Sequence, residues 1–478
     1  MTSPAPLHLI INGFHEAHHD AVWQALFARL PIASVEAIVS HRTRNAPSGV
    51  KLVKHLFSDL SFRAAYGTAD TTPIDEALLD EMADVETTFL RMSDRLEAAG
   101  PAPYAMRKRL YLRHVQHWNH VLRTRPITAA VFCNIPHETY DFVLYELCRR
   151  RGVPTLCFNQ SHVEDSFLVF EDWRDVLPGA RERLAELAND PEDGVAPHGL
   201  KGRYLAHFEK HTRRASSPVP FWMQRRSNVT WTDKLATTFT QLTSPRSWTG
   251  LAYRDYVARR ESLKRAALER CYGRLIRKTH AGTSYIYLPL HYQPELTTSP
   301  LAGQFVDQAL IAHLLSAATP PGVEIWIKEH PIQGSIGRSV EFYEELAEIP
   351  RVRLLPKNTD TFELIANALA VAKCTGTAGW EALFRGKPVL MFGDYLYQYA
   401  TGVFRIRSRA DLEDALTRMV KEAPTLVTTA RFLRLLQERA LEGCIDGDYK
   451  KVSSVDDARS AANISDALCA WLEGLEAR

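Results

Sequence analysis

The sequence predicts an α/β protein of two facing Rossmann-like lobes followed by a helical C-terminal tail. The chain of 478 residues exceeds what one core usually holds. Short apolar runs alternate with helical patterns in both halves, which implies parallel sheets. Several of these runs end abruptly in polar residues or glycines, where an α/β domain keeps its ligand site. We expect an N-terminal lobe at residues 1–250, a C-terminal lobe at 251–405 and the tail at 406–478.

The composition is that of a soluble globular protein and narrows the possible partners. Hydrophobic residues make up 45% and charged residues 24%, and the formal net charge of +2 gives no overall basic field of the kind that attracts nucleic acid. The seven cysteines form no CxxC pair or metal-spaced cluster, which favours a reducing compartment without structural zinc. No signal peptide is evident, and no run approaches the ~18 apolar residues of a membrane span. We therefore expect a cytoplasmic protein, which could still associate with the inner face of the membrane through a partner.

The N-terminal lobe is predicted to open with a strand at residues 7–11, a turn with a single glycine and a helix at 20–30. One glycine does not make the GxGxxG fingerprint of a dinucleotide site. Long helices are expected at 74–100 and 104–123, and the second is rich in arginine and histidine. Such a helix could contact an anionic acceptor, although a solvated face is the more frequent explanation. A β-α-β unit is then expected at residues 127–133, 140–151 and 154–158, with strand character returning at 168–170.

A long basic helix at 251–278 is predicted to lead into the C-terminal lobe, which is more regular. Strands are expected there at residues 285–290, 323–328, 352–355, 369–373 and 388–392. Helices are expected between them at residues 304–317, 339–347, 361–368 and 375–384. This alternation predicts a doubly wound parallel sheet. The tail from residue 409 is predicted to form three helices, with a linker at 442–448.

A glycine-rich turn at residues 375–379 lies between a predicted buried strand and a helix, and it predicts a phosphate site. The free backbone N–H groups at a helix start favour an anion, and small residues let it come close. The alternative is that the glycines only allow tight packing of strand and helix. Glu381, about one turn into the helix, could accept hydrogen bonds from ribose hydroxyls. The candidate residues of the turn are Thr375, Gly376, Thr377, Ala378 and Gly379.

Two further strand ends in this lobe carry candidate binding residues. After the strand at 323–328, Lys328, Glu329, His330 and Pro331 offer an ammonium and an imidazole that suit a phosphate leaving group. The alternative for the histidine is a bond to turn carbonyls. After the strand at 285–290, the candidates are His291, Gln293 and Glu295, of which Gln293 can both donate and accept. The alternative there is a solvated turn stopped by proline.

The N-terminal lobe must supply the group that does chemistry if the protein is a transferase. A carboxylate would serve there as general base on an acceptor hydroxyl or as a nucleophile. His137 and Glu138 follow the most apolar strand of the lobe directly, and Asp165 follows Glu164 in a polar loop after the next strand. An ordinary solvated loop is the alternative for Asp165, and the choice between Asp165 and Glu138 stays open.

The runs LPLHYQPE at 288–295, KEHP at 328–331 and GTAGWEALFRGKPVLMFG at 376–393 resemble the bacterial capsule polysaccharide biosynthesis family, which includes Kdo transferases. The resemblance implies a GT-B architecture whose C-terminal lobe holds the donor nucleotide. It also implies that His330 and Pro331 contact the donor phosphate and that Gln293 with its proline helps to form the donor pocket. Kdo transferases of this kind carry an EDGF-type motif with a catalytic aspartate. The nearest match here is EDSF at 164–167, where serine replaces the glycine.

These observations predict a glycosyltransferase that moves a sugar from a nucleotide-activated donor onto a capsular or surface glycan, which could be lipid-linked. The resemblance makes a CMP-Kdo-type donor the first choice. No DxD motif stands at a strand end, so neither a metal nor another cofactor is expected. The alternatives are a sugar-nucleotide epimerase or hydrolase with the same two lobes, and a non-catalytic glycan-binding subunit of a capsule assembly.

Overall fold

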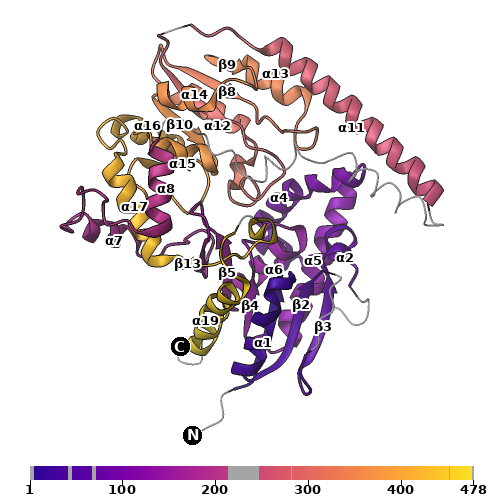
Figure 1. Ribbon diagram of the computed structural model, residues 1–478. Helices are drawn as coiled ribbons and strands as arrows, with labels where there is room; N and C mark the ends of the chain where they lie inside the picture. Colours follow the sequence, from indigo (N-terminus) through magenta and orange to yellow (C-terminus); the bar gives the residue numbers. More distant parts are fainter. Residues whose placement is uncertain are drawn as a thin grey trace.

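The computed structural model describes residues 5–40, 46–66, 72–213, 247–280, 282–451 and 453–475. It contains two mainly parallel sheets in two lobes that lie one above the other in Figure 1. The structure therefore confirms the predicted fold class, which is GT-B-like α/β with a helical C-terminal segment. Within the described ranges, none of the helices combines the length and apolar character that crossing a membrane requires.

The N-terminal sheet has seven strands in the order β13-β6-β5-β4-β1-β2-β3. The strands are β1 (Leu7–Asn12), β2 (Ile32–Val39), β3 (Lys51–Leu56), β4 (Ala129–Phe132), β5 (Thr155–Gln160), β6 (Ser166–Phe170) and β13 (Leu441–Glu442). The strands from β1 to β5 run parallel, whereas β6 pairs antiparallel with β5 and β13 pairs antiparallel with β6. The sequence predicted β1, β4, β5 and β6, but it gave no sign of β2 and β3.

Helices cover both faces of this sheet. Because successive side chains of a strand point to opposite faces, each strand contributes to two apolar cores. Ile10 belongs to the core under α4 (Ala83–Met92), α5 (Tyr104–Thr124) and α6 (Thr139–Arg150). Leu9 and Ile11 belong to the core under α1 (Asp20–Arg29) and α19 (Asp457–Leu475). Figure 1 shows α1 and α19, from opposite ends of the chain, side by side on one face. The helices of this lobe are η1 (Ala17–His19), α1 (Asp20–Arg29), α2 (Phe57–Arg63), α3 (Glu76–Glu81), α4 (Ala83–Met92), η2 (Ser93–Ala99), α5 (Tyr104–Thr124) and α6 (Thr139–Arg150).

The C-terminal sheet has six parallel strands in the order β12-β11-β10-β7-β8-β9. The strands are β7 (Tyr285–Pro289), β8 (Glu324–Lys328), β9 (Val352–Leu355), β10 (Ala370–Lys373), β11 (Val389–Met391) and β12 (Val403–Arg405). All but β12 were predicted. The helices are α11 (Ser247–Leu275), η3 (Gly303–Val306), α12 (Ala309–Ala318), α13 (Val340–Glu348), α14 (Thr361–Asn367), α15 (Thr377–Leu383) and α16 (Arg409–Arg418).

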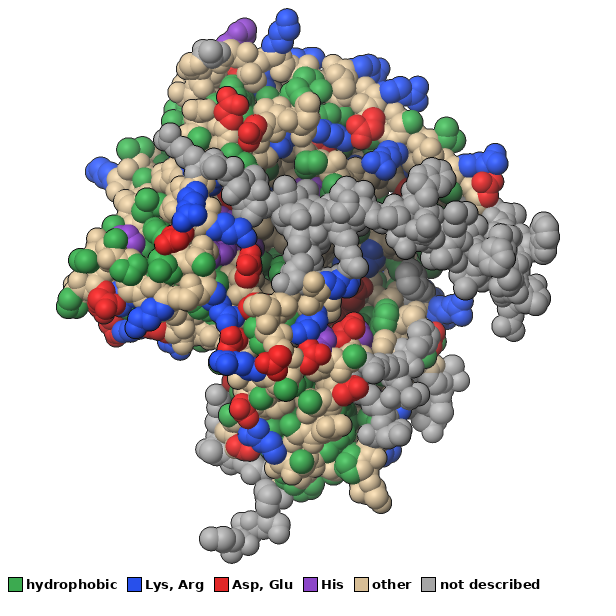
Figure 2. All heavy atoms as spheres, in the orientation of Figure 1, with side chains coloured by type: hydrophobic (Ala, Val, Ile, Leu, Met, Phe, Trp, Pro, Cys, Tyr) green, Lys and Arg blue, Asp and Glu red, His purple; other side chains and the backbone are tan. Residues whose placement is uncertain are grey.

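The chain crosses between the lobes in both directions. After β6, helices α7 (Ala180–Leu187) and α8 (Gly202–Thr212) pack on α17 (Leu426–Arg439), and the guanidinium of Arg183 binds both carboxylate oxygens of Glu438 at 2.8 Å. After α17, β13 joins the N-terminal sheet, and α18 (Gly447–Lys450) leads to α19 (Asp457–Leu475) on the N-terminal lobe. On the face drawn in Figure 2, basic and acidic side chains are interspersed over both lobes, in keeping with the net charge of +2. The predicted boundaries at residues 250 and 405 stay a prediction.

Candidate functional site

Three neighbouring strand ends bring most of the predicted donor-binding residues together. Strands β10, β7 and β8 are adjacent in the C-terminal sheet and run parallel. Their carboxyl ends therefore lie side by side, with Lys373 ending β10, His291 two residues beyond β7, and Lys328 ending β8. Hydrogen bonds join these ends directly. The backbone N–H of Thr375 donates to Nε2 of His291 at 3.3 Å, and the Thr375 hydroxyl donates to the carbonyl of Thr297 at 2.7 Å.

Position 376, in the turn before α15, requires glycine for two reasons. Gly376 has φ of +75°, a conformation that other residues rarely adopt. A Cβ atom on Gly376 would also lie 3.1 Å from Cε1 of His291 and 3.3 Å from Cε of Lys373. The hydroxyl of Tyr397 donates to the Gly376 carbonyl at 2.6 Å and fixes the turn from the other side. The turn is thus held tightly against both strand ends.

The second glycine, Gly379, is required by side-chain packing rather than by backbone conformation. A Cβ atom on Gly379 would lie 2.4 Å from the Tyr397 hydroxyl oxygen, so this position allows α15 to approach that ring. Thr377 opens α15, and Ala378 is buried within it. The helix is only seven residues long. Its start is therefore a weaker reason for anion binding than the charged side chains around it.

Lys373 is the central charged residue of the site, and the sequence did not single it out. Its side chain is 7% exposed, and its ammonium forms no hydrogen bond or ion pair with any residue in the described ranges. Burial lowers the pKa of Lys373 to about 8, and the nearby Glu381 carboxylate opposes that shift. Burial raises the pKa of Glu381 to about 7, against the influence of Lys373. The available signal was its position, the last residue of an apolar strand just before the glycine turn.

Lys328 and His330 differ in how their polar atoms are used. The Lys328 ammonium donates to the Thr359 carbonyl at 2.9 Å and to the Thr361 hydroxyl, so it already has partners. Nδ1 of His330 is buried without a partner. Burial lowers the pKa of His330 to about 4, and the positive charge of Lys373 adds to that shift. Pro331 follows at once and ends the strand extension.

A buried ion pair braces the loops behind these residues. The Arg338 guanidinium binds the Glu329 carboxylate at 2.7 Å, and both side chains are fully buried. Arg338 also donates to the His291 carbonyl at 2.8 Å and to the side-chain oxygen of Gln293, whose amide donates to the Val306 carbonyl at 2.5 Å. Glu329 and Gln293 are thus engaged within the protein, and they shape the site rather than offer free polar groups to it. No role for Arg338 was predicted, because its partners come from two other strand ends.

Glu295 lies in the loop after β7, two residues beyond Gln293, and is partly exposed. The Thr297 hydroxyl donates to its carboxylate at 2.8 Å. Its charge contributes to raising the pKa of Tyr449 to about 12, after burial and the charge of Asp446. Tyr449 belongs to α18, so the C-terminal segment lies near Glu295, at the edge of the predicted donor-binding residues.

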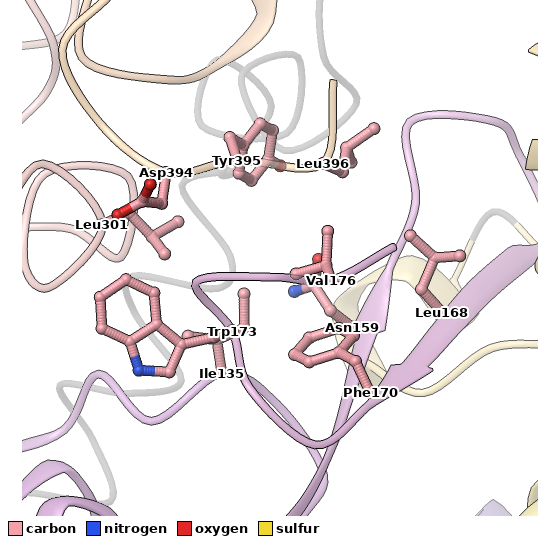
Figure 3. A pocket seen from close by; sticks show the side chains of 10 residues that line it. All are labelled: Ile135, Asn159, Leu168, Phe170, Trp173, Val176, Leu301, Asp394, Tyr395 and Leu396. Carbon is pink, nitrogen blue, oxygen red and sulfur yellow. The ribbon is translucent and has the colours of Figure 1, made fainter. Parts of the chain in front are cut away.

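In the N-terminal lobe, the loop after β4 faces the C-terminal lobe. Ile135 of this loop, together with Asn159, lies across a narrow pocket from Leu301 and Tyr395 of the other lobe (Figure 3). His137 and Glu138 follow Ile135 closely. Nδ1 of His137 donates to the Ile135 carbonyl at 2.7 Å, and the Glu138 carboxylate pairs with Arg95 at 2.5 Å. About a third of the Glu138 side chain is exposed.

Asp165 is placed differently from Glu138. Its backbone has φ of +59°, and its carboxylate accepts hydrogen bonds from the Ser453 hydroxyl at 2.6 Å and from the Ser454 N–H at 3.2 Å. Although burial works the other way, these bonds lower the pKa of Asp165. The carboxylate therefore holds the C-terminal segment against β6. Within the described ranges, none of its hydrogen bonds joins it to the strand ends that carry Lys373 and His291.

Three comparisons with known proteins bear on this site. The sequence model of the family described as "Capsule polysaccharide biosynthesis protein" matches residues 302–445, which include the ends of β8 and β10. The capsule polysaccharide modification protein LipA of Neisseria meningitidis is 36% identical over 73 residues, which are 15% of this chain and 10% of LipA. The chain thus matches only about a tenth of that relative's length.

Among solved structures, the β-Kdo 2,7-transferase KpsC of Thermosulfurimonas dismutans is similar with a TM-score of 0.32 and 10% identity, over 68% of this chain and 89% of that one. The UDP-GlcNAc 2-epimerase of Methanocaldococcus jannaschii has a TM-score of 0.26 and 10% identity, over 91% and 100% of the two chains. In the described residues, no group of three or more His, Cys, Asp or Glu side chains is arranged to hold a metal ion.

Proposed function

We propose that this chain, which carries a capsule polysaccharide biosynthesis domain at residues 302–445, is a glycosyltransferase that uses a nucleotide-activated sugar. The donor is proposed to be of the CMP-Kdo type, and the acceptor a capsular or surface polysaccharide, free or lipid-linked. The location is proposed to be the cytoplasm, at the inner face of the membrane. The family match supports the reaction class, and the chemistry of the strand ends supports an anionic, hydroxyl-rich donor.

One observation carries the proposal: the ends of β10 and β8, the two strands that flank β7, present polar groups without partners. Lys373 is a buried residue whose ammonium has no hydrogen-bond partner in the described part of the chain, and Nδ1 of His330 is a buried nitrogen without one. Burying such groups unpaired is unfavourable, so a site that keeps them implies a ligand that pairs with them. A phosphate supplies acceptor oxygens and negative charge for both. The charge that develops on the phosphate as the sugar leaves would be stabilised in the same place, without a metal or another cofactor.

The carboxylates around this pair suit the neutral part of a nucleotide sugar. Glu381 lies near Lys373 in the buried half of the site, and Glu295 lies at its exposed rim. Carboxylates accept hydrogen bonds from the hydroxyls of a sugar or ribose. We assign Glu381 and Glu295 to such hydroxyls. The Thr375–Gly376 turn then lines the pocket beside the phosphate.

For the chemical step we assign Glu138 as general base. Its loop faces the donor lobe, its carboxylate is accessible, and His137 stands beside it. The acceptor hydroxyl would give its proton to Glu138 while the acceptor oxygen attacks the anomeric carbon of the donor. The bond from that carbon to the phosphate oxygen breaks, and its electron pair stays on the phosphate that Lys373 and His330 hold. Asp165 is the competing candidate, as base or as nucleophile, and the transfer assay below decides between them.

The donor site is tested by thermal shift with CMP, UDP, GDP and ADP on wild type, Lys373→Gln and His330→Ala. We expect one nucleotide to stabilise wild type, and its Kd to rise about 10- to 100-fold in Lys373→Gln, as for loss of a charge-assisted hydrogen bond. Lys421→Gln, at an exposed position, is the matched control and should bind as wild type does. A shift that both site variants retain in full would refute the phosphate site.

The chemical step is tested by sugar transfer in Glu138→Gln and Asp165→Asn. Loss of transfer in Glu138→Gln with unchanged nucleotide binding supports the assignment, whereas loss only in Asp165→Asn would move the role to Asp165. Full activity of both variants would exclude both carboxylates.

A sugar-nucleotide epimerase or hydrolase is the second candidate. The unpaired Lys373 and His330 groups would bind the phosphate of its substrate equally well. Asp165, one of the two candidates for the transfer step, is hydrogen-bonded to the C-terminal segment. Product analysis without acceptor separates the two, because only the second candidate would convert or hydrolyse the donor alone. Nucleotide binding without any turnover would favour a non-catalytic glycan-binding subunit.

A further inference from the structure

One histidine of the N-terminal lobe reaches into the donor side of the molecule. His162 lies in the loop after β5, and its ring packs among three aromatic rings of the C-terminal lobe. The ring centroids are 5.4 Å from Trp380, 5.3 Å from Tyr395 and 6.1 Å from Tyr397. Trp380 belongs to α15, and Tyr397 donates to the Gly376 carbonyl. His162 therefore touches the rings that hold the glycine turn of the proposed donor site.

The loop that carries His162 has a fixed shape. The Ser161 and Ser166 hydroxyls are hydrogen-bonded at 2.6 Å, and the Val163 N–H donates to the Ser161 hydroxyl at 3.0 Å. The Gln160 amide donates to the Ser166 carbonyl at 2.9 Å. Hydrogen bonds thus fix the backbone on both sides of His162. They hold the imidazole against the other lobe without a ligand.

Neither nitrogen of this imidazole has a hydrogen-bond partner in the described residues, and Nε2 is buried. Burial lowers the pKa of His162 to about 3, and the charges of His211 and Lys373 add to that shift. The turn at Gly376 links the two residues, because Tyr397 beside His162 donates to the Gly376 carbonyl and a Cβ atom on Gly376 would lie 3.3 Å from Cε of Lys373. The residue as a whole is partly exposed.

A histidine that served only for packing would gain by losing its nitrogens, because unpaired buried polar atoms destabilise a protein. Another histidine against α15, His207, has a hydrogen-bond partner. Nε2 of His207 accepts a hydrogen bond from the Trp380 indole at 3.1 Å, and the His211 ring stacks on Phe384 at 4.8 Å. His162 and Lys373 are left as two polar groups without partners, one from each lobe, beside the same turn.

We infer that His162 is the N-terminal lobe's contact to the anionic group of the nucleotide sugar, and that it binds this group together with Lys373. The inference rests on the proposed function and adds a residue from the opposite lobe to the donor site. The negative charge of a bound anion favours the protonated imidazole and opposes the burial that lowers its pKa, so we expect His162 to take up a proton as the donor binds. Donor binding thereby ties the two lobes together at this point.

The test is titration calorimetry of CMP and UDP at pH 6.0, in two buffers of different ionisation enthalpy, which reports both Kd and proton uptake. Wild type is compared with His162→Phe, which keeps a ring in the cluster, and with His162→Gln, which keeps a donor but cannot take up a proton. We expect about 10-fold weaker binding and smaller proton uptake in His162→Phe. His162→Gln should recover part of the affinity and none of the uptake.

His211→Phe is the matched control for affinity, because His211 lies in the same cluster and has no proposed ligand contact; its Kd should equal that of wild type. Thermal unfolding without nucleotide should show His162→Phe to be folded and at least as stable as wild type. Wild-type Kd and proton uptake in His162→Phe would overturn the inference and leave the donor site standing. Failure of wild type to bind either nucleotide would overturn both.

Discussion

Replacing Lys373 by methionine should make the protein more stable while it weakens nucleotide binding. Methionine has nearly the length of lysine, so the packing around the chain is largely kept and the charge is removed. The pKa of Lys373 falls from 10.5 to about 8 because the ammonium is buried with little compensation. At 1.36 kcal/mol per pKa unit, the protonated form costs the folded protein about 3 kcal/mol. The Lys373→Met variant should recover most of that amount at pH 7.

The pH dependence gives the prediction its sign. Between pH 8 and pH 10.5 the unfolded chain still holds the proton on Lys373, whereas the folded protein has released it. Because the unfolded state then binds more protons, wild-type stability gains from this residue as the pH rises through that window. The variant lacks this gain. The difference in unfolding free energy should therefore be largest below pH 8 and shrink by about 2 kcal/mol at pH 9.5.

The measurement is urea unfolding of wild type and Lys373→Met at pH 7.0 and pH 9.5, with and without the nucleotide that stabilises wild type. Lys421→Met, at an exposed position, should leave the unfolding free energy within about 0.5 kcal/mol of wild type at both pH values. A variant less stable than wild type at pH 7.0, or a difference that does not change with pH, would show that Lys373 carries no buried charge.

Three further predictions follow from other parts of the fold. Burial lowers the pKa of His55 to about 4 and those of His114 and His117 to about 3, so the folded protein resists their protonation. Unfolding free energy should fall by several kcal/mol from pH 6.5 to pH 5, and less steeply in His117→Phe, as checked by urea unfolding. Gly376→Ala should lose about 1–2 kcal/mol and bind nucleotide more weakly, whereas Gly273→Ala in the exposed part of α11 should be neutral or stabilising; equal effects would contradict the strain argument. Arg338→Met should destabilise by about 3–5 kcal/mol because Glu329 is left buried and unpaired, and adding Glu329→Gln should restore part of it in the same assay.

The donor side of the site was largely predictable because it follows from a rule of topology. Polar residues after apolar runs mark carboxyl ends of strands, and adjacent parallel strands bring those ends together. His291, His330 and Thr375 were found in this way. Lys373 was not, since a lysine within an apolar run gains meaning only when the fold shows it buried without a partner.

The missing strands have a local explanation. Strand β3 lies at the edge of its sheet, and three of its six residues are lysine or histidine, a composition too polar to stand out. Strand β2 contains Glu36, whose carboxylate is buried against His55 and Arg125 from other elements. Asp165 was chosen by its neighbours in the sequence, and its actual partners are Ser453 and Ser454, almost three hundred residues later.

The pairing of β13 with β6 also bears on how the molecule is made. Until residues 441–442 leave the ribosome, β6 is an open edge with unpaired backbone groups, and such edges invite association between chains. Helix α19 comes later still, so the apolar face of α1 waits for it through the synthesis of the entire second lobe. The first lobe to emerge is therefore the last to be finished. Chains that stop before residue 441 should aggregate through their first half, even though the second sheet is complete.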